Sequence, residues 1–259
     1  MKGRPDHILS IKKATQVIEA LDTYGSLGTR ELSGILGMSK STIHRIISTL
    51  KDTGWIVENP STRKVQLGFK LFALGNNVVN RMGYRNILRR HMEELAEKTG
   101  ENVNLGMLLK ETVVHVDKVE SALPIKVDAT VGSATTSYNT ALGKVLLAEK
   151  SDKEIIDLFQ GYQFRKTAKN TITSLESLIS DIRQVREQEF AEDNEEFADG
   201  MKCYAIAIGS FDGQTRYALS TSFLRYRYLE EPEKEKQLLD SLLRTKRELI
   251  KLNFKVSSH

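Results

Sequence analysis

The sequence predicts an α+β protein with an N-terminal winged helix-turn-helix, a linker helix, and a C-terminal domain built on an antiparallel sheet. Three observations predict this fold class. Residues 10–54 follow a helical apolar period, and residues 55–67 have the pattern of a short hairpin. Beyond residue 100, strand patterns mix with segregated helices without a strict β-α-β alternation. We therefore expect domains at 1–68 and 84–259, joined by a linker helix at 69–83.

The bulk composition is that of a soluble globular protein. Of the 259 residues, 40% are hydrophobic and 28% are charged. No apolar run approaches the roughly 18 residues needed to span a membrane, and the N-terminus lacks the apolar core of a signal peptide. The single cysteine, Cys203, excludes an intramolecular disulfide and a multi-cysteine metal site. These features predict a cytoplasmic protein with no membrane partner and no cofactor.

The positive charge is concentrated near the N-terminus. Residues 1–75 contain 11 Lys and Arg against 6 Asp and Glu, a net charge of +5. The remaining residues contain 27 against 28, a net charge of −1. This asymmetry is typical of a polyanion-binding domain joined to a nearly neutral one.

Three short helices are expected before residue 55. The first has an apolar face and ends at a glycine: Ile11, Ala14, Val17, Ile18 and Leu21, then Gly25. In the second helix, Thr29 is the expected N-cap, the apolar face consists of Leu32, Ile35 and Leu36, and Gly37 ends the helix. In the third helix, Ser39 is the expected N-cap, the apolar face consists of Ile43, Ile46, Ile47 and Leu50, and Gly54 ends the helix. The second and third form a helix-turn-helix.

The outer face of the third helix carries hydrogen-bonding side chains and cations, with no acid before Asp52. These residues are Lys40, Ser41, Thr42, His44 and Arg45. A recognition helix needs such groups to reach base edges and phosphates in a major groove. We therefore predict double-stranded DNA as a partner, contacted by these residues and by Thr29.

The stretch after the third helix predicts a β-hairpin wing. Two apolar strands, at 55–57 and 65–67, flank the turn 59–64. Arg63 and Lys64 near its tip are predicted to contact phosphate or the minor groove.

An apolar connector follows the wing. A helical pattern through Phe69, Phe72 and Leu74 is expected to be interrupted at Gly75-Asn76-Asn77, after which a longer amphipathic helix begins. Such a connector either pairs with its copy in a dimer or packs onto its own domain.

The second domain is expected to contain three early strands, three helices, a late hairpin and a final helix. The strands lie at 103–109, 113–119 and 124–130, the helices at 140–150, 153–159 and 174–189, the hairpin strands at 203–211 and 216–223, and the last helix at 231–253. The hairpin is expected to turn through Asp212-Gly213.

The acidic run EDNEEFADGMKC, at 192–203, raises the question of chemistry. The common nucleotide-binding and hydrolase motifs are absent, and the run does not fit an EF-hand loop. A Cys203 nucleophile with His115 as base, and a metal held by Asp193, Cys203 and His115, remain alternatives. Glu195, Glu196 and Asp199 are expected to be solvated or structural, with Gly200 as the turn.

A ligand pocket is the other interpretation. Ala141 and Leu142 begin a helix whose free amides favour an anion. Ser220 and Ser222 share one face of a strand, and Cys203 and Asp193 lie on the neighbouring chain. These residues suit a ligand with an acid group beside a hydroxyl or ammonium donor. Spacing alone equally allows serines bonded within the sheet and a small core cysteine.

The chain resembles the IclR-type bacterial transcriptional regulators over nearly its full length. The stretches that carry the resemblance are KSTIHRIISTLKDTGWIVENPSTRKVQLGFKLFALG, VVHVDKVES, NTALGKVLLA, FAEDNEEFADGMKCYAIAIGSFDG and ALSTS. The last two are the more specific, since helix-turn-helix sequences occur in many families.

This resemblance implies a GAF-like C-terminal domain that binds a small-molecule effector, and a regulator, here expected to be a repressor, that is not an enzyme. It implies a homodimer or a tetramer on pseudo-palindromic operators, and a small carboxylic, hydroxy or keto acid as effector. The family's effector contacts fall on Ala141, Leu142, Asp193, Cys203, Ser220 and Ser222. An enzyme or metal-sensing domain tethered to a DNA-binding domain is the alternative.

Three positions depart from the family pattern. Asn194 replaces an acid, Ala207 stands where Pro is common, and Phe223 follows Ser222 where Gly is common. The bulky Phe223 is expected to narrow or reshape the pocket.

Overall fold

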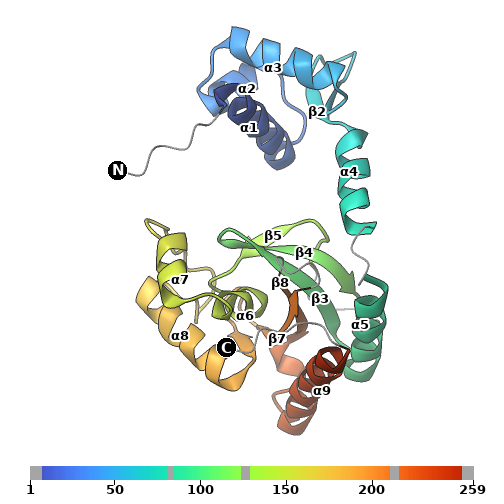
Figure 1. The fold of residues 1–259 in the computed structure, drawn as a ribbon, viewed down its shortest axis with the longest axis vertical. Coiled ribbons are helices and arrows are strands. Elements are labelled where there is room, and N and C mark those ends of the chain that lie inside the picture. The colour runs from blue at the N-terminus through green and yellow to red at the C-terminus, as the bar shows by residue number, and fades with distance from the viewer. Residues whose placement is uncertain (1–7, 81–84, 124–128, 211–215, 253–259) are drawn as a thin grey trace. The chain divides into compact units, whose positions relative to one another are not determined.

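The computed structural model describes residues 8–80, 85–123, 129–210 and 216–252, and the chain divides into two compact units, Met1–Gly83 and Tyr84–His259 (Figure 1). Within the described ranges, none of the helices combines the length and apolarity that a membrane span requires.

The N-terminal unit is a winged helix-turn-helix. Its elements are α1 (Leu9–Tyr24), α2 (Thr29–Leu36), α3 (Lys40–Asp52), β1 (Ile56–Glu58), β2 (Val65–Leu67) and α4 (Phe69–Asn80). The β1 and β2 strands pair in antiparallel fashion. Inner faces of the three helices and both strands form one core around Val17, Leu32, Ile43, Ile47 and Val65, as the helical period predicts.

Local chemistry fixes the helix ends. Gly37, at a φ of 62°, separates α2 from α3, a conformation that favours glycine. The Ser39 hydroxyl accepts a hydrogen bond from the Thr42 amide at 3.2 Å, as expected of a cap. The predicted Thr29 cap is wrong: Gly28 is the N-cap, and its amide donates to Glu31 Oε2 at 2.6 Å. Glu31 thus satisfies the amide of the N-cap residue.

Three further details differ from expectation. Ile11 is 59% exposed and Ile35 46% exposed, because only part of each predicted apolar face reaches the small core. Ile11 lies beside an open groove between the start of α1 and α3. The α4 helix runs without a break through Gly75-Asn76-Asn77, where local propensity predicted an interruption.

The C-terminal unit is an antiparallel six-stranded sheet with helices. Its strands are β3 (Asn102–Leu109), β4 (Thr112–Val119), β5 (Ala134–Thr136), β6 (Ala191–Asn194), β7 (Met201–Ser210) and β8 (Arg216–Leu224). Its helices are α5 (Arg85–Thr99), α6 (Ala141–Ala148), α7 (Asp152–Leu158), α8 (Leu175–Gln188) and α9 (Pro232–Lys251), with a 3-10 turn at Arg225–Arg227. The strand order is β5-β4-β3-β8-β7-β6. The α+β class is confirmed.

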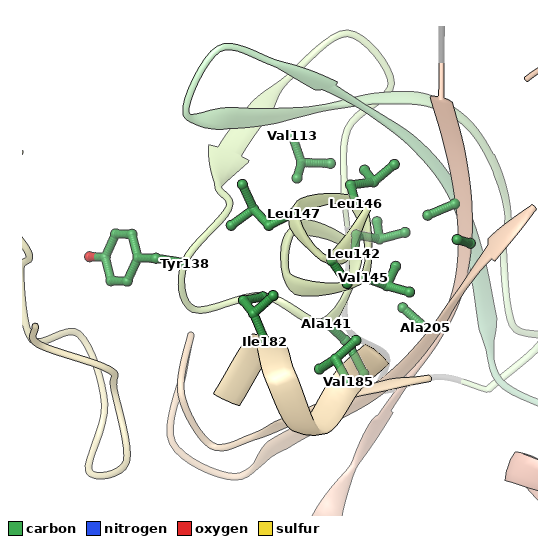
Figure 2. Packing of buried hydrophobic residues seen from close by; sticks show 14 of the residues in the cluster. Val113, Tyr138, Ala141, Leu142, Val145, Leu146, Leu147, Ile182, Val185 and Ala205 are labelled. Atoms are coloured by element: carbon green, nitrogen blue, oxygen red, sulfur yellow. The ribbon is translucent and has the colours of Figure 1, made fainter. Parts of the chain in front are cut away.

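Helices cover both faces of this sheet (Figure 1). The α5 and α9 helices lie on one face, and α6 lies against the other with α8 outside it. Figure 2 shows Leu142, Val145 and Leu146 of α6 packed between the sheet and α8. Strand alternation divides β7 between the faces: Cys203, Ala205 and Ala207 belong to the α6 cluster. This explains why the strands are buried on both sides.

The sheet corrects two expectations in this unit. Of the strand expected at 124–130, residues 124–128 lie outside the described residues, and Ala129 and Thr130 are not in a strand. The structure has a strand, β5, at Ala134–Thr136, which the sequence did not predict. The first three residues of the acidic run lie in a strand, β6, which the sequence did not predict because charged residues have low strand propensity. The Asp212-Gly213 turn lies outside the described residues.

Candidate functional site

A cavity of about 210 Å³ lies in the C-terminal unit. It is lined by Asn104, His115, Ala129, Thr130, Ser133, Thr135, Thr140, Ala141, Leu142, Asp193, Phe197, Met201, Cys203, Ser220 and Ser222. All six residues predicted to contact an effector are among them. The structure therefore brings together side chains from β6, β7, β8 and the start of α6 that span more than 80 positions of the sequence.

Strand register aligns five of these residues. Asp193 on β6 pairs with Cys203 on β7, and Cys203 pairs with Ser222 on β8. The Cys203 thiol donates to Ser222 Oγ at 3.2 Å. Ser220 lies two residues from Ser222 and pairs with Asn104 on β3. One sheet face thus presents a carboxyl, a thiol, two hydroxyls and an amide to the cavity.

The start of α6 forms another wall. Thr140 is the N-cap, and its hydroxyl accepts from the Gly143 amide at 3.2 Å. Among the described residues, no backbone carbonyl accepts from the amides of Ala141 or Leu142. The first amides of a helix carry partial positive charge and favour an anion.

Asp193 is the carboxyl group of the cavity and is only 1% exposed. Its Oδ1 accepts hydrogen bonds from the amides of Glu196 at 2.8 Å and Phe197 at 3.3 Å. Its Oδ2 has no hydrogen-bond partner among the described residues. Burial raises the pKa of Asp193 to about 7, with the nearby Glu196 charge adding to the effect.

Asn104 and His115 each have one side-chain polar atom without a hydrogen-bond partner in the described structure. These are Asn104 Oδ1 and His115 Nδ1. Asn104 Nδ2 donates to Ser222 Oγ at 3.3 Å, and His115 Nε2 lies 3.4 Å from Thr135 Oγ1. Burial lowers the pKa of His115 and favours the neutral imidazole. The sequence did not predict Asn104, because a lone Asn in an alternating strand carries no motif.

The two chemical alternatives gain no geometric support. Within the described ranges, no three His, Cys, Asp or Glu side chains are placed to hold a metal ion. Burial, reinforced by the Asp193 charge, raises the pKa of the Cys203 thiol well above its usual range. The thiol hydrogen bonds to Ser222 and not to His115, whereas a thiolate nucleophile needs a depressed pKa and an adjacent base.

The middle of the acidic run is more buried than the sequence predicts. Glu195 and Glu196 are 5% and 8% exposed, so of the two expectations, solvated or structural, the structural one holds for both. Glu195 forms ion pairs with Lys169 at 2.8 Å and with Arg225, and accepts from the Gly200 amide. Gly200, at a φ of 77°, is the turn before β7. These contacts hold the turn that follows Asp193 and leads into β7.

In the N-terminal unit, α3 presents the predicted DNA-contacting side chains. Lys40, Ser41, His44 and Arg45 are exposed, and neither Lys40 nor Arg45 has an ion-pair partner within the described ranges. Thr42 is half-buried, with its hydroxyl 2.8 Å from Ser39 Oγ. The first turn of α3 is therefore pre-organised by its cap.

The two wing residues, Arg63 and Lys64, form ion pairs within the N-terminal unit. Arg63 Nε lies 3.0 Å from Glu58, and Lys64 Nζ lies 2.9 Å from Glu31. Thr29, in the first turn of α2, is half-buried. The ion pair of Lys64 with Glu31 lowers the net positive charge that the wing offers to a phosphate.

Phe223 does not line the cavity. Strand alternation turns it to the opposite sheet face, where it is fully buried and its ring centroid lies 4.8 Å from Tyr228 and 5.8 Å from Tyr204. The expectation that it narrows the pocket is wrong.

Comparison with known proteins assigns both units. The family model for the C-terminal domain of the bacterial transcriptional regulator IclR matches residues 76–250, and the model for the IclR helix-turn-helix domain matches residues 10–60. The HTH-type transcriptional regulator KdgR of Escherichia coli strain K12 is 33% identical over 228 residues, which cover 88% of this chain and 87% of KdgR.

Solved structures share the fold. A putative IclR transcriptional regulator from Silicibacter sp. TM1040 aligns with a TM-score of 0.83 at 21% identity, covering 96% of this chain and 98% of that one. An IclR homologue from Microbacterium hydrocarbonoxydans, solved in complex with 4-hydroxybenzoate, aligns with a TM-score of 0.74 at 17% identity, covering 93% and 97%. The fold, the matched domains and the similarity to KdgR confirm the resemblance seen in the sequence, and the chain belongs to the IclR family of bacterial transcriptional regulators that bind DNA through a helix-turn-helix.

Proposed function

We propose that this regulator is a repressor whose DNA affinity is set by a small organic acid bound in the cavity of the C-terminal unit. The observation that carries the proposal is the convergence of Ala141, Leu142, Asp193, Cys203, Ser220 and Ser222 on one cavity. A volume of about 210 Å³ corresponds to about seven water molecules, which suits a metabolite smaller than most drug-sized ligands.

The chemistry of the lining selects an acid with a polar substituent. The free amides at the start of α6 receive a carboxylate, and the unpaired oxygens Asn104 Oδ1 and Asp193 Oδ2 accept from a hydroxyl group of the ligand. His115 Nδ1 donates or accepts according to its tautomer. The 4-hydroxybenzoate bound by the Microbacterium hydrocarbonoxydans homologue has this combination of groups.

Operator binding is assigned to α3 and the wing, within a domain at 1–68. Lys40, Ser41, Thr42, His44 and Arg45 enter the major groove, while Arg63, Lys64 and Thr29 contact the backbone. Such a regulator works in the cytoplasm, where the chromosome lies.

A second copy of the chain completes the regulator. The α4 helix, in the linker at 69–83, exposes Phe69, Phe72, Leu74 and Val78, with Phe69 77% exposed. An apolar stripe of this kind is covered by another helix, and pairing with its copy gives a homodimer that matches a pseudo-palindromic operator. A tetramer is the alternative assembly.

A thermal-shift screen with matched variants tests the proposal. Pyruvate, lactate, glycerate and 4-hydroxybenzoate are the probes, and at least one is expected to raise the melting temperature. Asp193→Ala and Ser222→Ala should abolish the shift, while Ser180→Ala, on the exposed side of α8, should keep it. A shift that persists in both cavity variants overturns the site, and turnover of a probe by the purified protein would indicate an enzyme instead.

A further inference from the structure

Among the residues that the structure describes, the cavity lining has a buried carboxyl group and no cation. None of its described lining residues is Lys or Arg, and Asp193 is the single acid among them. An anionic effector would therefore lie close to a second negative charge in a site shielded from water. Two like charges in such an environment cannot both stay ionised without a large cost.

The charged groups around Asp193 do not relieve this conflict. Cys203 faces it from β7 and His115 lines the cavity from β4, and neither carries positive charge at neutral pH. Within the described part of the chain, Lys144 of α6 is the cation that acts on Asp193. Its ammonium lies 2.7 Å from Glu196 and 3.1 Å from Asp181 of α8. One ammonium shared by two carboxylates leaves a net negative charge behind Asp193.

The geometry of the carboxyl group determines where a proton would go. Oδ1 is held as an acceptor by the amides of Glu196 and Phe197, while Oδ2 has no partner among the described residues. A proton on Oδ1 would displace two backbone hydrogen bonds. A proton on Oδ2 displaces none, and it turns the free acceptor into a donor.

We propose that an anionic effector binds together with one proton, which is taken from solvent onto Asp193 Oδ2 and donated in a hydrogen bond to an oxygen of the ligand. The inference rests on the proposed effector site. It deepens that assignment, because effector binding becomes sensitive to intracellular pH. Burial already raises the pKa of Asp193 to about 7 in the free protein, so only a small further shift is needed.

The linkage has a defined sign. Above the pKa of Asp193 in the free protein, ligand binding must draw a proton from solution, and affinity should fall about tenfold for each unit of rising pH. Below that pKa the carboxyl is already neutral, and affinity should level off. A ligand that binds ionised Asp193 through a hydroxyl would show no such fall.

Titration calorimetry in two buffers of different ionisation enthalpy counts the protons. The titrant is whichever of pyruvate, lactate, glycerate or 4-hydroxybenzoate gives the largest thermal shift, and the protein is the full chain. At pH 8 we expect uptake of about one proton per site. Binding with no uptake overturns this inference and leaves the effector site intact. Failure of every probe to bind overturns the proposed site and this inference with it.

Two variants identify the proton acceptor. Asp193→Asn places a permanent donor, Nδ2, at the Oδ2 position and keeps the acceptor at Oδ1. It should bind the same acid without proton uptake and with an affinity independent of pH. His115→Gln should still take up about one proton for each ligand that it binds. Uptake that persists in Asp193→Asn, or that is missing from the binding that His115→Gln retains, overturns the assignment.

An infrared measurement on the wild type does not depend on either variant folding. Ligand binding at pH 8 should convert a carboxylate stretch of the protein into the carbonyl stretch of a carboxylic acid. A difference spectrum without a new protonated carboxyl band would contradict the inference.

Discussion

The Lys144 ammonium lies 2.7 Å from Glu196 Oε1 and 3.1 Å from Asp181 Oδ2, with the lysine side chain only 2% exposed. This group of three ties α6 to α8 and to the turn that follows Asp193. Burial alone would lower the pKa of Lys144, but the two carboxylates more than offset it and raise the pKa above its ordinary value. The network therefore holds the start of α6 and the Asp193 loop in one geometry.

Removing the ammonium should leave the buried Glu196 carboxylate and the half-buried Asp181 carboxylate without their shared partner. We expect Lys144→Met to destabilise the C-terminal unit by about 3–5 kcal/mol, the cost of breaking a buried ion pair from one side. Urea unfolding followed by far-UV circular dichroism measures this, with Lys153→Met on the exposed side of α7 as the matched control. Adding Glu196→Gln to Lys144→Met should recover part of the loss. Equal stability of the two lysine variants would contradict a structural role for the network.

The raised pKa of Asp193 should also appear in stability. Its pKa is about 7 in the folded state against an ordinary value of 3.8, so the folded state holds the proton more tightly than the unfolded one. The loss in free energy of unfolding that comes from burying the ionised carboxylate is absent below pH 4 and grows until pH 7. At about 1.4 kcal/mol per pH unit it reaches on the order of 4 kcal/mol.

Asp193→Asn removes this penalty. Relative to the wild type, its free energy of unfolding should rise by about 3 kcal/mol between pH 5 and pH 8. Urea titrations at the two pH values measure the difference. Parallel pH profiles for the two proteins would show that Asp193 titrates near its ordinary value.

The recognition helix and the wing should contribute unequally to DNA binding. Arg45 is exposed and free of an ion-pair partner in the described structure, whereas Lys64 is already paired with Glu31. Arg45→Ala should weaken specific binding by about 1–3 kcal/mol, and Lys64→Ala should cost less. Fluorescence anisotropy on a DNA fragment selected by the protein measures both. The affinity for DNA should also fall steeply as the salt concentration rises. An unchanged affinity in Arg45→Ala would exclude α3 as the recognition helix.

Gly143 allows α6 to approach the preceding turn. A Cβ added there would fall on the backbone of Ser137, including its carbonyl oxygen, and backbone cannot move aside cheaply. Gly143→Ala should therefore destabilise the unit by several kcal/mol and displace the helix start that lines the cavity. Gly34→Ala is the matched control, since nothing lies within 4 Å of its added Cβ in α2. It should stabilise its helix by up to about 1 kcal/mol. Melting temperatures of the two variants, compared with that of the wild type, test this. A melting temperature of Gly143→Ala equal to that of the wild type would contradict the close packing at Ser137.

Local patterns predicted most elements, and their failures have physical causes. The caps and glycine stops around α2 and α3 were readable because capping depends on near neighbours in sequence. The β6 strand was missed because its stability comes from pairing with β7, which overrides the poor strand propensity of its acidic residues. Phe223 was misplaced relative to the cavity, although strand period alone puts it opposite Ser222.

The sequence by itself determined the winged helix-turn-helix, the α+β class and the family, because these follow from apolar periodicity, turn residues and motif stretches that are local in the chain. Only the tertiary structure decided which polar side chains meet. Asn104 and His115 join the six expected residues through strand pairing across the sheet, and Lys144 meets Glu196 across 52 positions. The raised pKa of Asp193 has the same origin, since burial and neighbouring charges are properties of the packed domain and not of its acidic run.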